Sequence, residues 1–330
     1  MTRDRLKALL TKFSSTRVLV IGDLMLDEFI WGKVDRISPE APVPVVWAER
    51  ESAMPGGAAN VAGNVQALGG QARLVGVIGR DACGERLTHE LQARGISTED
   101  ILIEPDRPTT AKTRVVAHHQ QVVRIDREKT HPIVGQLLQR LLETAKAAVP
   151  QVDGIIIEDY GKGLITPSLL RPLVSLAKRS KKVITVDPKE EHFRYYRGVT
   201  ALTPNKKEAA LAAKLPITDE ASLLQAGRKI MRTLRPEVLL MTLGEEGMRL
   251  FGRDGSKPVK IPTVAQEVFD VSGAGDTVIA AFTLARAAGA SFLEAAVISN
   301  AAAGVVVGKV GVATCSPEEL EQKLFAAGSR

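Results

Sequence analysis

Residues 270–277 have the sequence DVSGAGDT, which contains two acidic residues and several small ones. An apolar segment follows directly. Gly273, Ala274 and Gly275 leave the backbone bare where a helix is expected to begin. Their N–H groups and the helix dipole therefore predict an anion-binding site. Asp276 lies inside this site, where a bound phosphate would repel its carboxylate. This placement indicates a base for an attacking hydroxyl group, and the alternative is a first-turn acid that complements the dipole.

A second glycine-rich turn, Gly56-Gly57, leads into a helical segment that carries Asn60 and Asn64. Glycine lets the backbone approach a ligand closely, and two asparagines four residues apart share one helix face. These features suit hydrogen bonding to a polyol. A tight turn with a solvent-facing asparagine pair is the alternative.

Asp23 and Asp27 flank the end of the first apolar run of the chain. A carboxylate accepts hydrogen bonds from two vicinal hydroxyl groups, so this pair is suited to gripping a sugar. Each residue, taken alone, is also an ordinary helix or turn cap.

Asn205 and Glu208 lie three residues apart at a predicted helix start, which is the spacing of a capping box. Their oxygens could instead hold Mg²⁺, through water, beside the phosphates of ATP. Segment 242–247 (TLGEEG) ends another strand with a turn whose backbone could approach a nucleotide. It matches neither a Walker A motif nor a placed dinucleotide-binding fingerprint.

Short apolar runs of strand length alternate with helical patterns along most of the chain. This alternation predicts a parallel sheet with helices on its faces and a ligand cleft at the carboxyl ends of the strands. The expected strands are 17–22, 155–157, 183–186, 201–203 and 238–243, and the expected helices are 133–149, 167–179, 206–214 and 219–234. The cleft residues are then Asp23, Asp159, Asp187, Asn205 and Gly244.

Segments 42–51 and 110–126 interrupt this rhythm with extended, non-helical character. They predict a small sheet that projects as a lid, with strands from about 33–51 and 107–128, and the alternative is an antiparallel edge of the main sheet. Because no linker-like stretch divides the chain, we expect residues 1–330 to form one domain with this lid.

Composition narrows the class of protein. The net charge of +6 comes from 44 basic and 38 acidic residues spread along the chain, and aromatic residues make up 4%. Nucleic-acid binding requires clustered basic residues with aromatic partners, so it is not expected, whereas a modest positive charge suits small anionic substrates.

Cys83 and Cys315 lack metal-ligand spacing, and no signal-peptide or membrane-spanning run is present. We therefore expect a cytoplasmic protein without membrane association.

The order of these motifs resembles that of the ribokinase-like PfkB carbohydrate kinases over nearly the whole chain. The resemblance implies an α/β fold with a mostly parallel central sheet, flanking helices and a β-sheet lid. Segments 21–27, 36–45, 120–126 and 159–163 look like those of the D-glycero-β-D-manno-heptose 7-phosphate kinases, which supply ADP-heptose for lipopolysaccharide inner core in Gram-negative bacteria. No nucleotidyltransferase motif follows residues 317–320, so we expect the stand-alone form without an adenylyltransferase domain.

The resemblance also implies a reaction, in which ATP phosphorylates the anomeric hydroxyl of heptose 7-phosphate to give the 1,7-bisphosphate. Asp276 matches the catalytic base. The N–H groups of Gly273, Ala274 and Gly275 would donate hydrogen bonds to the negatively charged oxygens of the transferred phosphoryl group. The expected sugar contacts are Asp23, Gly57 and Asn60, with Arg124, Lys162 and Lys189 for the 7-phosphate and Arg124 reaching from the lid. Asn205, Glu208, Thr242, Gly244 and Gly247 are expected on the ATP side, with Mg²⁺ at Asn205 and Glu208 through water. By analogy, lid strands would pair two subunits into a homodimer.

Three other functions compete with this interpretation. A PfkB-type kinase for another sugar, a sugar phosphate or a nucleoside would carry the same motif at 270–277. An NAD-dependent oxidoreductase needs a glycine-rich turn after the first strand, where Gly22 instead leads into Asp23-Leu24-Met25. A non-catalytic sugar-binding protein has no need of the acid at Asp276.

Overall fold

The central element of the computed structural model, which describes residues 1–118, 120–265, 268–309 and 311–325, is a large sheet. Within these ranges it has nine strands. Seven of them pair in parallel, and the last two along the chain add antiparallel pairs at one edge. In spatial order they are β13 (Val259–Ile261), β12 (Met248–Gly252), β11 (Val238–Thr242), β10 (Ala201–Leu202), β9 (Val183–Asp187), β8 (Gly154–Glu158), β1 (Arg17–Gly22), β4 (Gln71–Ile78) and β5 (Ile101–Ile103).

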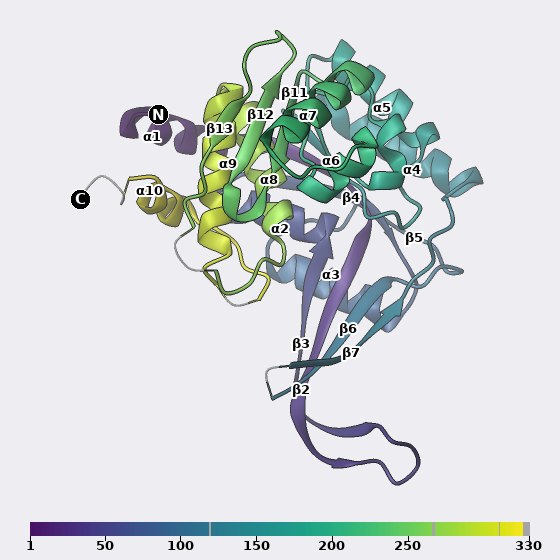
Figure 1. Ribbon diagram of the computed structural model, residues 1–330. Coiled ribbons are helices and arrows are strands. Elements are labelled where there is room, and N and C mark those ends of the chain that lie inside the picture. The colour runs from purple at the N-terminus through teal and green to yellow at the C-terminus, as the bar shows by residue number, and fades with distance from the viewer. Residues whose placement is uncertain (119, 266–267, 310, 326–330) are drawn as a thin grey trace.

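Helices cover both faces of this sheet (Figure 1). One face carries α1 (Arg3–Phe13), α2 (Ala58–Ala67), α3 (Ala82–Ala93), α8 (Ala274–Ala287), α9 (Phe292–Val306) and α10 (Pro317–Phe325). The other carries α4 (Gly135–Ala148), α5 (Pro167–Arg179), α6 (Lys206–Ala213) and α7 (Glu220–Leu234). Short 3₁₀ turns are η1 (Val149–Gln151), η2 (Glu190–Tyr195) and η3 (Gly244–Glu246).

Strand β1 shows why the apolar runs form a sheet buried on both sides. Side chains alternate between the two faces of a strand, so Val18 and Val20 pack into one core while Leu19 and Ile21 pack into the other. All four are fully buried. The predicted α/β class with a mostly parallel sheet is therefore confirmed, and each expected strand and helix is present within a few residues of its expected bounds.

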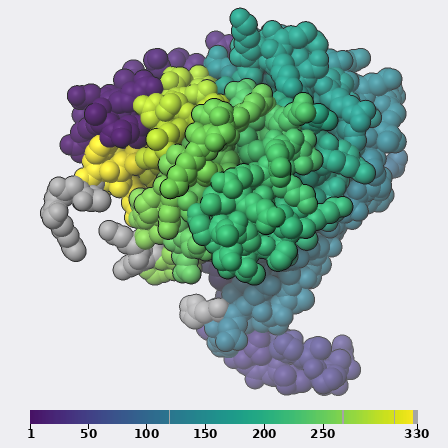
Figure 2. All heavy atoms as spheres, turned by 45° about the horizontal axis from the view of Figure 1, so that its top comes forward, coloured from purple at the N-terminus to yellow at the C-terminus, as the bar shows by residue number. Residues whose placement is uncertain are grey.

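A second sheet projects from this body. Its order is β3 (Pro44–Gly57), β2 (Leu24–Ile37), β6 (Thr110–Ala117) and β7 (Gln120–Arg127), and β2 pairs antiparallel with β3 but parallel with β6. Figures 1 and 2 show the β2–β3 end standing clear of the main body. The predicted small separate sheet is thus present, rather than an extra edge of the main one.

This lid sheet starts earlier than predicted, because β2 begins at Leu24 and not near residue 33. Asp27, for which the sequence suggests either sugar binding or a capping role, lies within this strand, as does Glu28. Neighbouring side chains satisfy them: Arg114 donates to Asp27 at 2.5 Å and Thr113 to Glu28 at 2.7 Å, both from β6. No helix in the described ranges is long and apolar enough to cross a membrane.

Candidate active site

The first turn of α8 places Asp276 at the meeting point of three elements. Gly273, the N-cap residue, has a φ of 76°, a left-handed conformation that glycine adopts without strain. The Asp276 side chain is 4% exposed. Its Oδ2 accepts a hydrogen bond from Nδ2 of Asn60 on α2 at 2.6 Å, and its Oδ1 accepts one from the Tyr160 hydroxyl at 2.9 Å. The carboxylate is therefore held in one orientation.

Burial sets the protonation behaviour of this carboxyl group. Removal from water raises the pKa of Asp276 from its ordinary value of 3.8 to about 6, and the two hydrogen bonds limit the rise. Asp276 is therefore ionised at neutral pH and is a stronger base than an exposed aspartate. A base of this strength is suited to accept a proton from a hydroxyl group.

The backbone around this turn offers fewer free donors than the sequence suggests. The N–H of Ala274 donates to the carbonyl oxygen of Val271 at 3.2 Å. Within the described residues, the N–H groups of Gly273 and Gly275 have no hydrogen-bond acceptor. Two of the three predicted donors are therefore available to an anion at the helix N-terminus.

Asn60 and Asn64 share a helix face as predicted, but neither faces solvent. Asn64 is fully buried, donates to Asn60 and accepts from the Thr277 hydroxyl at 2.8 Å. Asn60 donates to Asp276 and is 6% exposed. The pair forms a buried chain that fixes α2 against α8. At the start of α2, Gly57 has a φ of 55°, and a Cβ there would lie 2.5 Å from the carbonyl oxygen of Asp23.

Asp23 organises the loop that follows β8. Its carboxylate accepts backbone hydrogen bonds from Tyr160 at 2.9 Å, Lys162 at 3.0 Å and Leu164 at 3.2 Å. Burial and the charge of Asp159 raise the pKa of Asp23 to about 6. The residue that sequence reasoning assigned to sugar binding therefore holds the loop that carries Tyr160.

Asn205 and Glu208 form the capping box that the spacing allows. The Asn205 Oδ1 accepts from the backbone N–H of Glu208 at 3.0 Å, and the Glu208 Oε2 accepts from that of Asn205 at 2.9 Å. The second carboxylate oxygen of Glu208, Oε1, makes no hydrogen bond within the described residues. Thr242 lies alongside, because its N–H donates to the carbonyl oxygen of Pro204.

The turn after β11 leaves space beside this helix start. Gly244 has a φ of 60°, and a Cβ on it would meet no atom within 4 Å. Gly247 is enclosed instead, since a Cβ there would lie 2.2 Å from the carbonyl oxygen of Ile261. Open backbone at Gly244 is compatible with a flat ligand such as a nucleotide base, whereas Gly247 has a structural reason to be glycine.

The three basic residues predicted to hold a substrate phosphate each have an acidic neighbour. Lys162 pairs with Glu128 at 2.7 Å, Arg124 with Asp126 at 2.9 Å and Lys189 with Glu190 at 3.0 Å. Lys162 alone among them lines a small cavity with Asp23. Each of the three cations is therefore paired with an acid in the described part of the chain.

Sequence reasoning missed several side chains near Asp276. Tyr160 is one, and nothing in its spacing distinguishes it from a core tyrosine. Glu158 is another, at the end of β8, where it was passed over in favour of its neighbour Asp159. Asp159 points elsewhere and accepts from Tyr196 at 2.6 Å and His192 at 2.8 Å. Asp187 is among the residues that the sequence places in the cleft, but the sequence assigns it no function.

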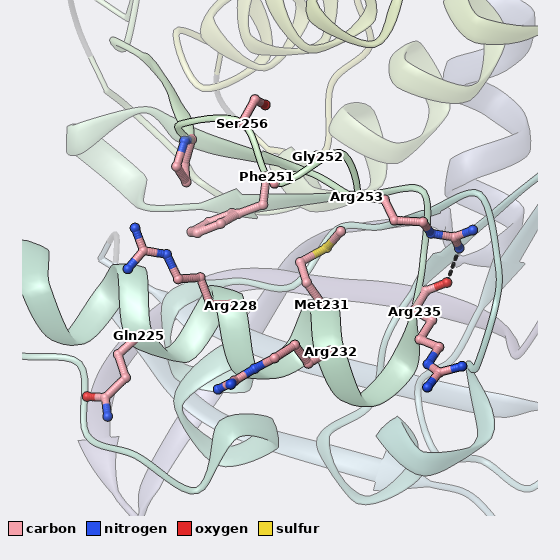
Figure 3. A pocket seen from close by; sticks show the side chains of 11 residues that line it. Gln225, Arg228, Met231, Arg232, Arg235, Phe251, Gly252, Arg253 and Ser256 are labelled. Atoms are coloured by element: carbon pink, nitrogen blue, oxygen red, sulfur yellow. Dashed lines mark hydrogen bonds between the residues drawn. The ribbon is translucent and has the colours of Figure 1, made fainter.

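A cleft of about 1040 Å³ lies away from these residues, between α7 and the end of β12 (Figure 3). Arg228, Arg232, Arg235 and Arg253 are among its lining residues. Arg253 donates to the carbonyl oxygens of Arg235 and Pro236, so it caps the carboxyl end of α7. This cleft lies at the end of the sheet where strand β11 begins. Asp276 and Asn205 lie at the opposite end, beyond the carboxyl ends of the parallel strands.

The parallel sheet, the projecting small sheet and a buried carboxylate at a helix N-terminus are the features expected of a ribokinase-like sugar kinase. The chain belongs to the pfkB family of carbohydrate kinases, whose model matches residues 15–319. The predicted family, fold and enzyme class are therefore confirmed.

The curated relatives of this chain are longer proteins, of which it matches a part. It is 46% identical over 312 residues to the bifunctional protein HldE of Desulfatibacillum aliphaticivorans, covering 94% of this chain and 64% of that protein. It is 47% identical over 320 residues to the bifunctional protein HldE of Trichlorobacter lovleyi, covering 97% and 65%. The chain therefore spans about two thirds of the length of these relatives.

Solved structures share the fold at low identity. Phosphofructokinase-2 from Escherichia coli in complex with potassium aligns with a TM-score of 0.77 and 21% identity, covering 96% of this chain and 99% of that one. Arabidopsis thaliana ribokinase complexed with ribose and ATP aligns with a TM-score of 0.73 and 20% identity, covering 94% and 98%. At such identities the likeness is one of fold.

Proposed function

We propose that this chain transfers the γ-phosphoryl group of ATP to the anomeric hydroxyl of D-glycero-β-D-manno-heptose 7-phosphate, giving the 1,7-bisphosphate for ADP-heptose and lipopolysaccharide inner-core synthesis. The observation that carries the proposal is the position of Asp276, a buried base beside free N–H groups of a helix N-terminus. The motifs at 21–27, 36–45, 120–126 and 159–163 support the choice of sugar, as does the 44–47% identity to relatives named HldE.

In this mechanism Asp276 accepts the proton of the attacking hydroxyl as the new phosphoester bond forms, while the bond from the γ-phosphorus to the β–γ bridging oxygen breaks and ADP leaves. Asn60 and Tyr160 keep its carboxylate aimed at the hydroxyl. The N–H groups of Gly273 and Gly275 stabilise charge on the transferred phosphoryl group. Closure of the lid sheet excludes water and so limits hydrolysis of ATP.

The ATP side is assigned to Asn205, Glu208, Thr242, Gly244 and Gly247. Mg²⁺ requires hard oxygen ligands and retains several waters, and the free Oε1 of Glu208 suits that requirement. Mg²⁺ bound there would neutralise phosphate charge. Because Asn205 uses its Oδ1 in the capping box, Glu208 is the better supported ligand of the two.

The substrate phosphate is assigned to Lys162, with Arg124 and Lys189 as further cations. Lys162 is favoured because it lines a small cavity together with Asp23 and its side chain is 16% exposed. Binding of a phosphate requires the lysine to exchange Glu128 for the ligand. Asp23, Gly57 and Asn60 remain the proposed sugar contacts, and Asp23 also holds the loop that carries Tyr160.

A panel of acceptors tests the proposal by measuring ADP release. We expect heptose 7-phosphate to exceed fructose 6-phosphate and unphosphorylated sugars in kcat/KM by at least about tenfold. Asp276→Asn should lower kcat by roughly 10²- to 10⁴-fold, while Asp254→Asn, an exposed control, should not. A different preferred sugar would contradict the substrate assignment, and sugar binding without ADP release would favour a non-catalytic role.

We further propose a cytoplasmic homodimer that forms through its lid strands. Cys83 and Cys315 are free and buried, which suits a reducing compartment. The anomeric phosphate of the 1,7-bisphosphate product is the group that an adenylyltransferase would convert into an ADP-sugar. The same polypeptide or a separate protein could carry that activity.

A further inference from the structure

We propose that the cleft between α7 and the end of β12 binds a small molecule that carries a chain of two or more phosphate groups. Among the described residues that line it none is acidic, and four are arginines: Arg228, Arg232, Arg235 and Arg253. Its volume of about 1040 Å³ is sufficient for a small-molecule ligand. The proposal does not depend on which sugar the enzyme phosphorylates.

Three of the four arginines are free to meet a ligand. Arg228, Arg232 and Arg235 are exposed, and within the described ranges their side chains make no hydrogen bond or ion pair. Arg253 differs, because it donates to the backbone carbonyl oxygens of Arg235 and Pro236. Figure 3 shows Arg253 beside Arg235 at one end of the cleft and Arg228 toward the other. The three free guanidinium groups therefore retain all their donors for a ligand.

Helix α7 carries a positive charge that the helix itself does not compensate. Its single acid, Glu220, lies in the first turn and is held by Arg249 at 2.7 Å. Arg228 and Arg232 lie four residues apart, so they share a helix face, where like charges repel each other. The helix dipole favours cations within the last turn, and Arg228 precedes that turn. A bound anion would offset the repulsion between the two arginines.

The walls of the cleft are fixed by packing. A Cβ on Gly227 of α7 would lie 2.2 Å from the ring of Phe251, so glycine there lets β12 pack directly against the helix. The loop after β12 is open at Gly255, where a Cβ would meet no atom within 4 Å. The one acid of this loop, Asp254, accepts the backbone N–H of Ser256 at 3.1 Å. The cleft is therefore formed before any ligand binds.

The chemistry of the lining favours phosphate over an acidic peptide. The planar guanidinium group donates paired hydrogen bonds that match the oxygens of a phosphate, and several arginines match several charges. A bound peptide commonly pairs with a free strand edge or places apolar anchors in pockets. Strand β12 is already paired on both sides, by β11 and β13, and the Phe251 ring is buried.

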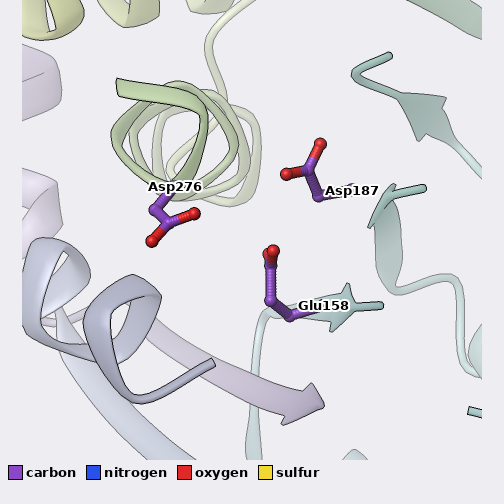
Figure 4. Close-up of side chains that lie close together, drawn as sticks. All are labelled: Glu158, Asp187 and Asp276. Atoms are coloured by element: carbon purple, nitrogen blue, oxygen red, sulfur yellow. The ribbon is translucent and has the colours of Figure 1, made fainter. Parts of the chain in front are cut away.

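The acids of the candidate active site lie at the other end of the sheet. Glu158 and Asp187 end β8 and β9, and Figure 4 shows their carboxylates near that of Asp276. One carboxylate oxygen from each lies within 4.8 Å of the other two. These carboxylates repel a phosphate chain that has no metal ion bound to it. A metal-free polyphosphate therefore distinguishes the arginine cleft from the active site.

Isothermal titration calorimetry with inorganic tripolyphosphate in EDTA tests the proposal. We expect one molar equivalent to bind per chain, and binding to weaken as salt is added. The double variant Arg228→Gln/Arg232→Gln should bind about tenfold more weakly or worse, because charge-assisted hydrogen bonds are lost. Glutamine is a good helix former, so α7 should stay folded. The matched control, Arg140→Gln/Arg171→Gln, removes the same charge from exposed positions on α4 and α5 and should bind like the wild type.

The proposal is overturned if tripolyphosphate does not bind in EDTA, or if the Arg228→Gln/Arg232→Gln variant binds it as tightly as the wild type. Equal losses in the control variant would also overturn it, because the attraction would then come from the net charge of the chain. Hexaglutamate should bind at least about tenfold more weakly than tripolyphosphate. Tighter binding of hexaglutamate would assign the cleft to an acidic protein segment instead.

ADP in the same buffer separates two sources of the phosphate chain. A nucleotide ligand of the cleft should displace tripolyphosphate, whereas a cleft that accepts only an inorganic chain should retain it. Either result supports a polyphosphate site, provided that the Arg228→Gln/Arg232→Gln variant loses the binding.

Discussion

The burial of Asp276 lowers the stability of the folded protein at neutral pH, and it raises the basicity of the Asp276 carboxylate. Its ionised form is buried next to other acids, so its pKa rises to about 6 in the folded protein. A raised carboxyl pKa means that folding is favoured most below the unfolded pKa near 4, and that this advantage is lost as the pH rises through 6.

Asp276→Asn should therefore stabilise the fold at pH 8 while it impairs catalysis. We expect the free energy of unfolding at pH 8 to rise, by at most the roughly 3 kcal/mol to which the pKa shift corresponds, because asparagine can accept only one of the two hydrogen bonds made to Asp276. The gain should vanish near pH 4. Urea denaturation at both pH values measures it, and equal stability of the two proteins at pH 8 would argue against a buried charge.

Tyr160 acts on the same carboxylate as a positioning residue. Its hydroxyl donates to Oδ1 of Asp276, which lowers the pKa of Asp276 relative to burial alone. In Tyr160→Phe the ionised form loses this donor, so the pKa should rise further, by about one unit.

The pH dependence of kcat/KM tests this role for Tyr160. The wild-type profile should rise with an apparent pKa of about 6, and the Tyr160→Phe profile should rise at higher pH. Activity of the variant should therefore fall more at pH 6 than at pH 8. A uniform loss at all pH values would instead indicate a purely structural contribution.

At the scale of elements, the start of α6 forms a capping box and has a proposed role in Mg²⁺ binding, and variants can separate the two. Asn205→Ala removes the helix cap and should lower the free energy of unfolding by about 1 kcal/mol. Asn205→Asp retains a capping oxygen and should fold with nearly wild-type stability.

Glu208→Gln addresses the proposed Mg²⁺ role directly. Glutamine preserves the reciprocal hydrogen bond of the capping box but lacks the charge, so stability should remain within about 0.5 kcal/mol. KM for MgATP should rise or kcat should fall. Unchanged kinetics would leave Glu208 as a capping residue alone.

At the scale of the whole molecule, the exposed edge strands of the lid sheet predict an interface between two chains. Its edge strand β7 is exposed along its length, and Val123 and Ile125 are 46% and 53% exposed on one face. Trp47 on the other edge strand is 74% exposed. Exposed apolar edge strands are ready to pair with another chain.

We therefore expect sedimentation of the protein as a dimer, and dissociation when Val123 and Ile125 are both replaced by lysine. Leu293→Lys, at 46% exposure on α9, is the control and should remain dimeric. A wild-type protein that sediments as a monomer at micromolar concentration would contradict the lid interface.

The sequence alone determined the elements of the main sheet and the small residues of its turns. Apolar runs such as 17–22 and 183–186 must be buried on both faces, and glycine at 273 allows a helix start that few other residues adopt. Local physical chemistry fixes both features, so they are readable along the chain.

Only the tertiary structure decided which atoms each polar side chain meets. Asn64 is turned inward to Thr277, Asp23 is bound by three backbone N–H groups, and Tyr160 reaches Asp276 across 116 residues. The clustering of Glu158 with Asp187 depends on strand pairing and on the angle at which α8 meets the sheet. Such contacts join residues distant in sequence, and spacing carries no information about them.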